Sequence, residues 1–237
     1  MQKNNKKPFG IMLIKEESKR LPRKNFMNFH GKPMFKHIHD AAKKTSLFND
    51  IIISTESDKI INICKKNKIK IYFKRPDKLS KSSTSLNDVI KHAIRNCNEI
   101  TKNSSEFCLL WATAPLVRPS DLINSYKIFK KKKSIQCVVG VKKNYEYYST
   151  LTENKYDNFL SPIYKSKITN LRKQKLKIKY VINSSFAWIK KDNFLKSNNW
   201  LLPNTLPYVM DSARSVDLDY PKDLEVLKIF AKKLNLK

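Results

Sequence analysis

Short apolar runs alternate with longer amphipathic stretches along most of the chain. The short runs are rich in β-branched residues and predict buried strands; they cover residues 9–14, 50–57, 69–74, 107–113 and 134–143. The longer stretches have apolar residues on one side at helical spacing; they predict helices over residues 31–48, 57–68, 83–97 and 118–133. This alternation is typical of a mostly parallel sheet covered by helices on both faces.

The rest of the chain departs from this pattern and then returns to it. Residues from about 143 to 180 are polar and rich in Tyr and Lys, so we interpret them as a small extension lobe that binds substrate or contacts a second subunit. A strand follows at 180–191, and the chain ends with a predicted strand at 214–219 and a helix that begins near Pro221. We therefore predict one α/β domain, 1–237, built on a Rossmann-like, mostly parallel sheet.

The formal net charge of +29 first suggests a protein that binds nucleic acid. However, the chain has 42 Lys against 7 Arg, together with 22 Asn and 3 Gly, and the lysines are scattered. This skew is what AT-rich coding sequence produces in any protein, whereas proteins that read bases favour Arg and interleaved aromatic residues. We therefore do not expect a nucleic-acid partner.

The cysteines and the hydropathy indicate the compartment. The four cysteines lie far apart and mostly within apolar runs, so we expect buried free thiols in a reducing environment. Cys and His residues show no zinc-binding spacing. No apolar run approaches the roughly 20 residues that a membrane-spanning helix needs, and the short apolar run near the N-terminus does not resemble a signal peptide. The sequence predicts a cytoplasmic protein without a membrane partner.

The loop after the first predicted strand, "KEESKRLPRKN", is a candidate anion site because ligands gather at the carboxyl ends of parallel strands. It carries Lys15, Ser18, Lys19 and Lys24, which could supply point charges and hydrogen-bond donors to a triphosphate. The loop has no glycine, and Glu16 and Glu17 stand where a phosphate-binding loop favours bare backbone. From these residues alone, a solvated basic turn explains the loop equally well.

The stretch "SVDLD" near the C-terminus places two carboxylates, Asp217 and Asp219, on one side of a predicted strand. Paired carboxylates beside a phosphate site suit Mg²⁺, which keeps several waters and binds substrate phosphates. Such a metal favours attack at an α-phosphorus and departure of pyrophosphate. A helix N-cap is the alternative role, and it explains Asp219 but not Asp217.

Two polar segments give weaker indications. Trp111 and Thr113 end a buried strand among small residues that would let a ligand approach the backbone. Arg75 begins a polar loop that also holds a Ser/Thr cluster, including Ser82 and Ser83. A strand end before a capped helix and an ordinary surface loop explain these segments equally well.

A third indication comes from Arg172, which is followed by Phe186 and Trp188 in register on the next predicted strand. An arginine with nearby aromatic rings could grip a carboxylated sugar. Aromatic residues on a strand more often belong to the core.

Taken in order, these segments resemble the CMP-sialic acid synthetase (acylneuraminate cytidylyltransferase) family. The resemblance covers nearly the whole chain and runs through "SKRLPRKN", "GKPM", "LFNDIIISTESDKI", "RPDKL", "ATAPL", "FAWIKK" and "SVDLDYPKDLEV". The aromatic residue before "ATAPL" and the run "LRKQKLKIKYVINSSFAW" look most like the pseudaminic acid cytidylyltransferase branch.

The resemblance implies a nucleotide-diphospho-sugar transferase fold, CTP and Mg²⁺, a nine-carbon sugar acid and a homodimer. In that family, the anomeric hydroxyl of the sugar acid attacks the α-phosphorus of CTP and gives the CMP-sugar and pyrophosphate. Matching positions imply phosphate binding by Lys15, Ser18, Lys19 and Lys24, a ribose contact by Asn25, cytosine recognition by Arg75 with Ser82 or Ser83, metal binding by Asp217 and Asp219, and a sugar-carboxylate contact by Arg172. Trp111, Thr113, Phe186 and Trp188 complete the expected substrate site.

The chain departs from the family pattern in the first loop. Arg-Gly-Gly is usual there, and this chain has Lys15, Glu16 and Glu17. Glycines let backbone approach a phosphate closely, and arginine supplies a bidentate fork that lysine lacks. Two alternatives therefore stay open: a sister enzyme for legionaminic or sialic acid, and a degenerate member that binds nucleotide or sugar without turnover.

Overall fold

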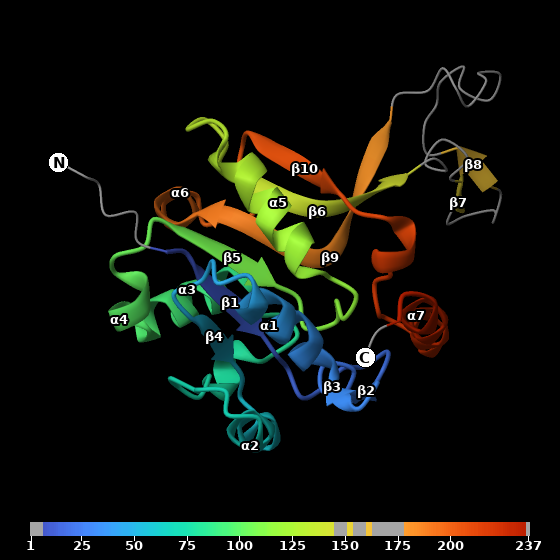
Figure 1. The fold of residues 1–237 in the computed structure, drawn as a ribbon, viewed down its shortest axis with the longest axis horizontal. Coiled ribbons are helices and arrows are strands. Elements are labelled where there is room, and N and C mark those ends of the chain that lie inside the picture. The colour runs from blue at the N-terminus through green and yellow to red at the C-terminus, as the bar shows by residue number, and fades with distance from the viewer. Residues whose placement is uncertain (1–6, 145–150, 154–159, 163–177, 236–237) are drawn as a thin grey trace.

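A six-stranded sheet with the order β10-β6-β9-β5-β1-β4 forms the centre of the protein (Figure 1). The computed structural model describes residues 7–144, 151–153, 160–162 and 178–235. The strands are β1 (Phe9–Leu13), β4 (Ile51–Ser54), β5 (Glu106–Leu110), β6 (Cys137–Asn144), β9 (Lys179–Lys190) and β10 (Thr205–Val209). Strand β9 runs antiparallel to β5 and β6, while the other neighbours pair in parallel. The predicted mostly parallel α/β sheet is confirmed.

Helices cover both faces of this sheet, with α1 and α5 on one face and α3 on the other (Figure 1). The helices are α1 (Met34–Lys44), α2 (Asp58–Lys66), α3 (Leu86–Asn96), α4 (Asn98–Thr101), α5 (Pro119–Lys130), α6 (Lys191–Ser197) and α7 (Pro221–Lys233). Two antiparallel strand pairs lie outside the central sheet: β2–β3 (Asn28–Phe29 and Lys32–Pro33) and β7–β8 (Leu151–Glu153 and Leu160–Pro162). Within the described ranges, no helix has the length and apolar character to cross a membrane.

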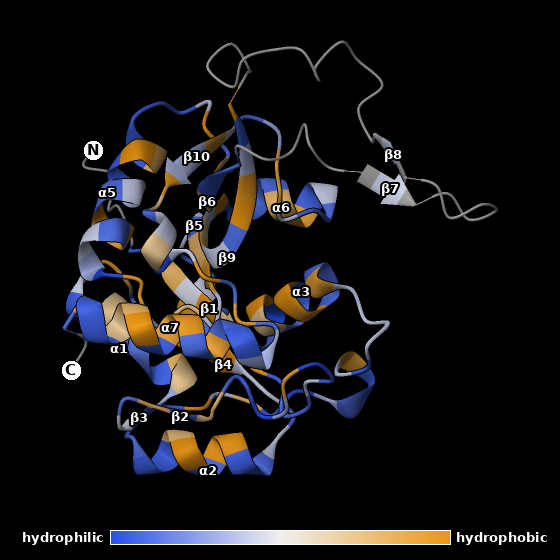
Figure 2. Ribbon diagram, turned by 90° about the vertical axis from the view of Figure 1, so that its right-hand side faces the viewer, coloured by the Kyte–Doolittle hydropathy of each residue, from blue (hydrophilic) through white to orange (hydrophobic). Residues whose placement is uncertain are grey.

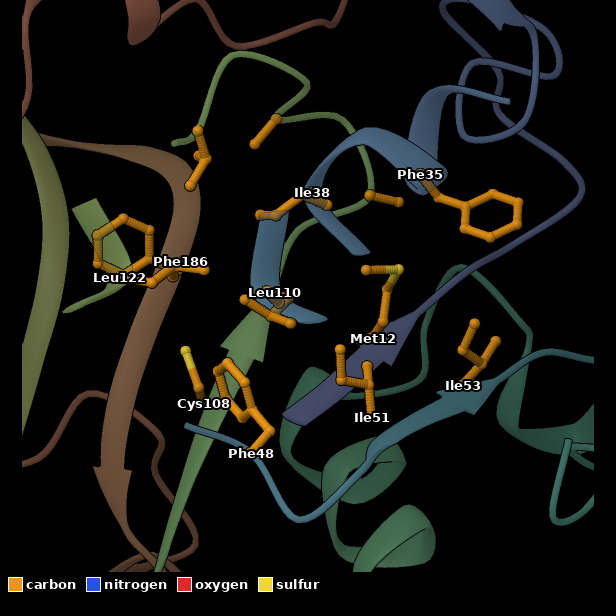
Figure 3. Close-up of a cluster of buried hydrophobic side chains, with 14 of the residues drawn as sticks. Met12, Phe35, Ile38, Phe48, Ile51, Ile53, Cys108, Leu110, Leu122 and Phe186 are labelled. Atoms are coloured by element: carbon orange, nitrogen blue, oxygen red, sulfur yellow. The ribbon is translucent and has the colours of Figure 1, made fainter. Parts of the chain in front are cut away.

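The two sheet faces carry two separate apolar cores because successive side chains on a strand point to opposite faces. On β1, Met12 joins the core beneath α1 and α5, which also contains Phe35 and Leu122 (Figure 3). The adjacent Ile11 joins the core on the α3 side. The helices match this division, since α1 and α3 each have an apolar side and a polar side (Figure 2). Burial on both faces explains why the strands appear in the sequence as continuous apolar runs.

Two predicted strands are absent. Residues 69–74 make no sheet pairing, although Ile71 packs against one core and Tyr72 against the other. Residues 214–219 also lie outside the sheet; a short 3₁₀ turn, Ser212–Arg214, is followed by chain without regular secondary structure. In both segments the apolar side chains pack against the core, but the backbone forms no hydrogen bonds to a neighbouring strand. The sequence also missed α6 and β10, which occupy 191–209.

A third apolar cluster joins the C-terminal helix to the first loop of the chain. Leu218, Leu227 and Ala231 come from the end of the chain. They pack with Leu21, Phe29, Met34 and Leu116. Helix α7 therefore lies beside the β2–β3 hairpin (Figure 1), and residues nearly two hundred positions apart in the sequence share one small core.

The pairing between β6 and β9 shifts in register at Gly140. Val139 pairs with Ala187 but Val141 pairs with Ile182, so the β9 residues between them bulge opposite Gly140. A Cβ atom on Gly140 would lie 2.1 Å from Ser185 Oγ and 2.8 Å from Asn183 Oδ1. The absence of a side chain at Gly140 therefore makes room for this polar bulge.

We expect Gly140→Ala to destabilise the protein by about 1–3 kcal/mol, because overpacking forces backbone or side-chain shifts. The free energy of unfolding, measured by urea denaturation, would fall relative to wild type. The control is Lys132→Ala, at an exposed position, which should leave the unfolding midpoint within error of wild type. Equal stability of the two variants would show that the bulge can relax away from Gly140.

Candidate active site

The loop after β1 is folded so that Lys24 reaches the acidic segment near the C-terminus. Leu21 anchors the loop in the third cluster, and a turn with Arg23 at φ 60° reverses the chain. The Lys24 amine then lies 2.8 Å from Asp219 Oδ1 and 2.9 Å from the carbonyl oxygen of Leu218. The structure thus brings together two candidate segments, the basic loop and "SVDLD", that the sequence could only connect by resemblance.

Asp219 has a second cationic partner that the sequence did not single out. An Nη atom of Arg20 lies 2.8 Å from the same Oδ1 atom, and the guanidinium also lies over the Tyr220 ring, 5.3 Å from its centroid. The arginine was visible in "SKRLPRKN", but nothing local showed that its partner would be a carboxylate 199 positions later.

The helix-cap alternative for Asp219 is wrong, because the N-cap residue of α7 is Tyr220 and the carboxylate in its capping box is that of Asp223. The Asp223 carboxylate accepts hydrogen bonds from the backbone N–H of Tyr220 at 2.7 Å and of Asp219 at 3.0 Å. These bonds satisfy N–H groups at the start of α7. The Asp219 side chain is therefore free for the contacts with Lys24 and Arg20.

Asp217 is held by a serine on β9. The Ser184 hydroxyl donates a hydrogen bond of 2.9 Å to Asp217 Oδ2. Between the two aspartates, Leu218 is fully buried in the third cluster. Burial of this leucine fixes the backbone between the two aspartates.

The two carboxylates fit a magnesium ion that relies on substrate for part of its coordination. Asp217 Oδ1 and Asp219 Oδ2 accept no hydrogen bond from the residues that the structure describes. Within the same residues, no group of three or more His, Cys, Asp or Glu side chains forms a protein-only metal cage. Two hard oxygen ligands, completed by phosphate oxygens and water, are what Mg²⁺ accepts beside a nucleotide.

Glu16 is engaged by the start of α2. Its carboxylate accepts hydrogen bonds from the hydroxyl of Ser57 and, at 3.0 Å, from the amine of Lys59. The Ser57 hydroxyl bond and then the Lys59 amine lower the pKa of the Glu16 carboxyl. The backbone N–H of Glu16 donates to Glu56 Oε1 at 2.9 Å. The loop without glycines is thus held in place through both main chain and side chain at this residue, whereas Glu17 is exposed.

Arg75 holds the second polar loop against the ends of two strands. It is only 4% exposed, and its guanidinium donates to the carbonyl oxygen of Ile14 at 3.1 Å, to Ser80 Oγ at 2.9 Å and to the Glu56 carboxylate. Burial opposes ionisation of Glu56, but the N–H of Glu16 and the Arg75 guanidinium outweigh it and lower the pKa of this carboxyl. Glu56 is a residue that sequence analysis missed, although it stands in the polar stretch that follows β4.

Open clefts surround these two loops. One of about 510 Å³ is lined by Lys15, Glu16, Glu17, Glu56, Asp77, Ser80 and Lys81. A second of about 230 Å³ shares Lys15 and Lys81 with it and includes Arg75 and Ser82. A third of about 290 Å³ is lined by the first loop itself, with Ser18 and Lys19 among its residues. Five of the predicted residues, Lys15, Ser18, Lys19, Arg75 and Ser82, therefore line spaces near the carboxyl ends of β1 and β4, whereas Lys24, Asn25 and Ser83 line none of these three.

A separate cleft of about 580 Å³ lies on the other side of the acidic segment. It is lined by Lys142, Lys143, Asn144, Val181, Ser212, Ser215, Val216, Asp217 and Asp223. Asp217 therefore borders a space lined by charges of both signs, with two lysines from β6 and the carboxylates of Asp217 and Asp223.

The remaining predicted residues lie in different settings. The Asn25 side chain donates to the carbonyl oxygen of Lys15 at 2.8 Å and so supports the first loop. Trp111 is half-buried in edge contact with Trp200, and Thr113 is buried. Ser83 is exposed in the second polar loop. Arg172 and most of the predicted lobe at 143–180 lie outside the described residues.

Phe186 and Trp188 are core residues and not substrate contacts. Both have no exposed surface, and they belong to the core under α1 and α5 (Figure 3 labels Phe186). The Trp188 indole stacks on Phe48 and donates to Ser125 Oγ at 2.9 Å. Neither ring could reach a ligand without disruption of the core, so the prediction for these two residues is wrong.

Three features together define a nucleotidyltransferase-like protein. They are the mostly parallel α/β sheet, the basic loop after its first strand, and the carboxylate pair that this loop contacts. A family model described as "Cytidylyltransferase" matches residues 10–230. The chain belongs to this family of CTP-dependent nucleotidyltransferases, and the resemblance found in the sequence is confirmed.

Individual relatives agree with this membership. The chain is 27% identical over 219 residues to a pseudaminic acid cytidylyltransferase from Campylobacter jejuni, covering 91% of this chain and 92% of the relative. It is 28% identical to an N-acylneuraminate cytidylyltransferase from Streptococcus agalactiae, covering 92% of this chain but only 51% of that longer protein. A solved CMP:2-keto-3-deoxy-manno-octonic acid synthetase complexed with CTP superposes with a TM-score of 0.68 at 15% identity, covering 96% of this chain and 99% of that one. The last likeness shows the shared fold.

We expect Glu16→Ala to raise the KM for CTP by about 2- to 5-fold. The bonds to Ser57 and Lys59 are half-exposed, and such contacts stabilise a conformation by on the order of 0.5–1 kcal/mol. Steady-state kinetics at saturating sugar acid would measure the change. The matched control is Glu17→Ala, which removes an exposed negative charge beside the same loop and should leave the KM for CTP unchanged or lower it. Equal increases in the two variants would contradict a holding role for Glu16.

Proposed function

We propose that this protein transfers CMP from CTP to a nonulosonic acid of the sialic type, in the first place pseudaminic acid. The anomeric hydroxyl of the sugar acid would attack the α-phosphorus, the bond to the β-phosphate would break, and pyrophosphate would leave. The observation that carries the proposal is the contact of Lys24 with Asp219, which places the basic loop beside a carboxylate pair in a cytidylyltransferase chain.

The nucleotide would occupy the clefts at the carboxyl ends of β1 and β4. Lys15, Ser18, Lys19 and Lys24 would bind the triphosphate, while Asn25 keeps their loop in shape through its bond to the Lys15 carbonyl. Arg75 and the loop with Ser82 and Ser83 would form the cytosine side, with Arg75 acting mainly by holding that loop. Asp217 and Asp219 would hold Mg²⁺, which supplies neutralisation of phosphate charge when bound.

The sugar acid would occupy the cleft bordered by Asp217. Its carboxylate is an anion and would face Lys142 and Lys143 on the β6 side of that cleft, away from the carboxylates of Asp217 and Asp223 that line it as well. We extend the same proposal to Arg172 as a further carboxylate contact. The preference for pseudaminic acid is supported by a relative that is 27% identical over 91% of this chain, while a CMP-N,N'-diacetyllegionaminic acid synthase with the same identity keeps legionaminic acid as the alternative. A homodimer in the cytoplasm, with the 143–180 segment near the partner subunit, remains part of the proposal.

With CTP, Mg²⁺ and a panel of pseudaminic, legionaminic and sialic acids, we expect pyrophosphate release that depends on the acid, fastest with pseudaminic acid. A coupled phosphate assay and detection of the CMP-sugar by mass spectrometry would measure it. Faster turnover of another acid would reassign the substrate. If CTP bound but no acid released pyrophosphate, the chain would instead be a non-catalytic nucleotide-binding member of the family.

We expect Asp219→Asn to lower kcat at least about 100-fold, because it removes charge from a metal ligand and from the partner of Lys24. The fold should persist, since the capping of α7 depends on Asp223; circular dichroism melting would verify this. Asp192→Asn, at an exposed position on α6, is the control and should retain full activity. Retained turnover in Asp219→Asn would remove this residue from the metal site.

A further inference from the structure

Ser184 has a backbone conformation that serine rarely adopts. Its φ is 48°, in the left-handed region that glycine occupies without a steric penalty. It lies in the β9 bulge opposite Gly140, directly beside the carboxyl end of β5, where the N–H of Trp111 donates to the Ser185 carbonyl. A glycine would fit this backbone better, so the side chain of Ser184 calls for an explanation.

The neighbouring residues of the bulge account for its structural role without Ser184. Asn183 is 3% exposed; its amide donates to Ser215 Oγ at 3.1 Å, and its carbonyl oxygen accepts from Ser185 Oγ at 2.6 Å. Ser215 Oγ in turn donates to the carbonyl oxygen of Asp211 at 2.8 Å. This chain of hydrogen bonds fastens the bulge to the segment that leads into Asp217.

Ser184 differs from these neighbours in its partner. It is half-buried, and its hydroxyl donates to Asp217 Oδ2 at 2.9 Å. That bond fixes the rotation of the carboxylate and leaves Oδ1 without a donor from the described residues. An outer hydrogen bond of this kind orients a ligating carboxylate before the metal arrives.

We infer that Ser184 is a positioning residue for Asp217, retained in a strained conformation because its hydroxyl orients this carboxylate toward metal-bound nucleotide. This inference deepens the proposed function and rests on it for the identity of the bound ligand, a divalent cation carried by CTP. The β9 bulge, Gly140 opposite it and the left-handed conformation of Ser184 together fix the orientation of the Asp217 carboxylate.

Two substitutions separate the hydroxyl from the strain. Ser184→Ala removes the hydroxyl and keeps a Cβ in the left-handed conformation, whereas Ser184→Gly removes both. Both variants should bind Mn²⁺–CTP about 10-fold more weakly than wild type, measured without sugar acid by water-proton relaxation. Both should bind CTP in EDTA as wild type does. In thermal unfolding, Ser184→Gly should melt above Ser184→Ala, since only glycine relieves the strain.

Two further variants, Asp217→Asn and the double variant Ser184→Ala/Asp217→Asn, complete a double-mutant cycle with wild type and Ser184→Ala. If Ser184 acts through Asp217, the double variant should bind Mn²⁺–CTP no more weakly than Asp217→Asn alone. Equal Mn²⁺–CTP affinity in wild type and both Ser184 variants would overturn the inference. So would a weakening that persists in EDTA, or a wild-type protein whose CTP affinity does not respond to the metal.

Failure of the proposed function gives a different result. In that case, wild type would form no CMP-sugar from any acid of the panel, yet Mn²⁺–CTP binding would still depend on Ser184 and the inference about Asp217 would stand. Wild-type turnover with unchanged metal binding in both Ser184 variants would leave the function in place and overturn the inference alone.

Discussion

The contact between the Lys24 amine and the acidic segment is the interaction on which the candidate site depends. One ammonium group meets Asp219 Oδ1 and the carbonyl oxygen of Leu218 at 2.8 and 2.9 Å. An ion pair between partly buried side chains by itself stabilises a fold very little, because removing the two charges from water offsets their attraction. What makes this one durable is the apolar cluster beneath it, where Leu21 of the loop and Leu218 of the acidic segment are buried together. Hydrophobic packing of the two leucines brings the two segments together, and this places the Lys24 amine within hydrogen-bonding distance of Asp219.

Glutamates in a phosphate loop appeared contradictory in the sequence, and the structure separates their effects. The Glu16 carboxylate accepts hydrogen bonds from Ser57 and Lys59, so it already has a cationic partner before any nucleotide arrives. Its backbone N–H is committed to Glu56, which Arg75 also holds. A loop with glycines gains close approach to phosphate at the cost of flexibility. This loop is fixed from outside by α2 and the second polar loop, and only Glu17 keeps an exposed charge beside it.

Much of the fold could be predicted from the sequence because the strongest patterns in it are local. The strands β1, β4, β5, β6 and β9, and the helices between them, have continuous burial or clear amphipathic spacing. The strand β10 was missed because it is largely exposed, and residues 69–74 were wrongly assigned because apolar alternation does not reveal whether a partner strand exists. Alternation likewise placed Phe186 and Trp188 on a common face but could not say that this face is the core. Glu56 and Arg20 depend on partners distant in sequence, which no local pattern encodes.

The direction of β9 explains how polar side chains of a strand come to lie beside the Asp217 carboxylate. Parallel strands such as β1 and β5 end in apolar, mostly buried residues at this edge, and their polar groups stand in the loops that follow. Strand β9 is antiparallel, so residues in its first half reach the same edge while still paired to β6, and its second half pairs with β5. The register shift at Gly140 then allows Asn183, Ser184 and Ser185 to leave the regular ladder there. A rigid strand can therefore present hydroxyl and amide groups to the acidic segment with a precision that a free loop lacks. The one strand that breaks the parallel pattern is, by its direction, the one able to brace Asp217.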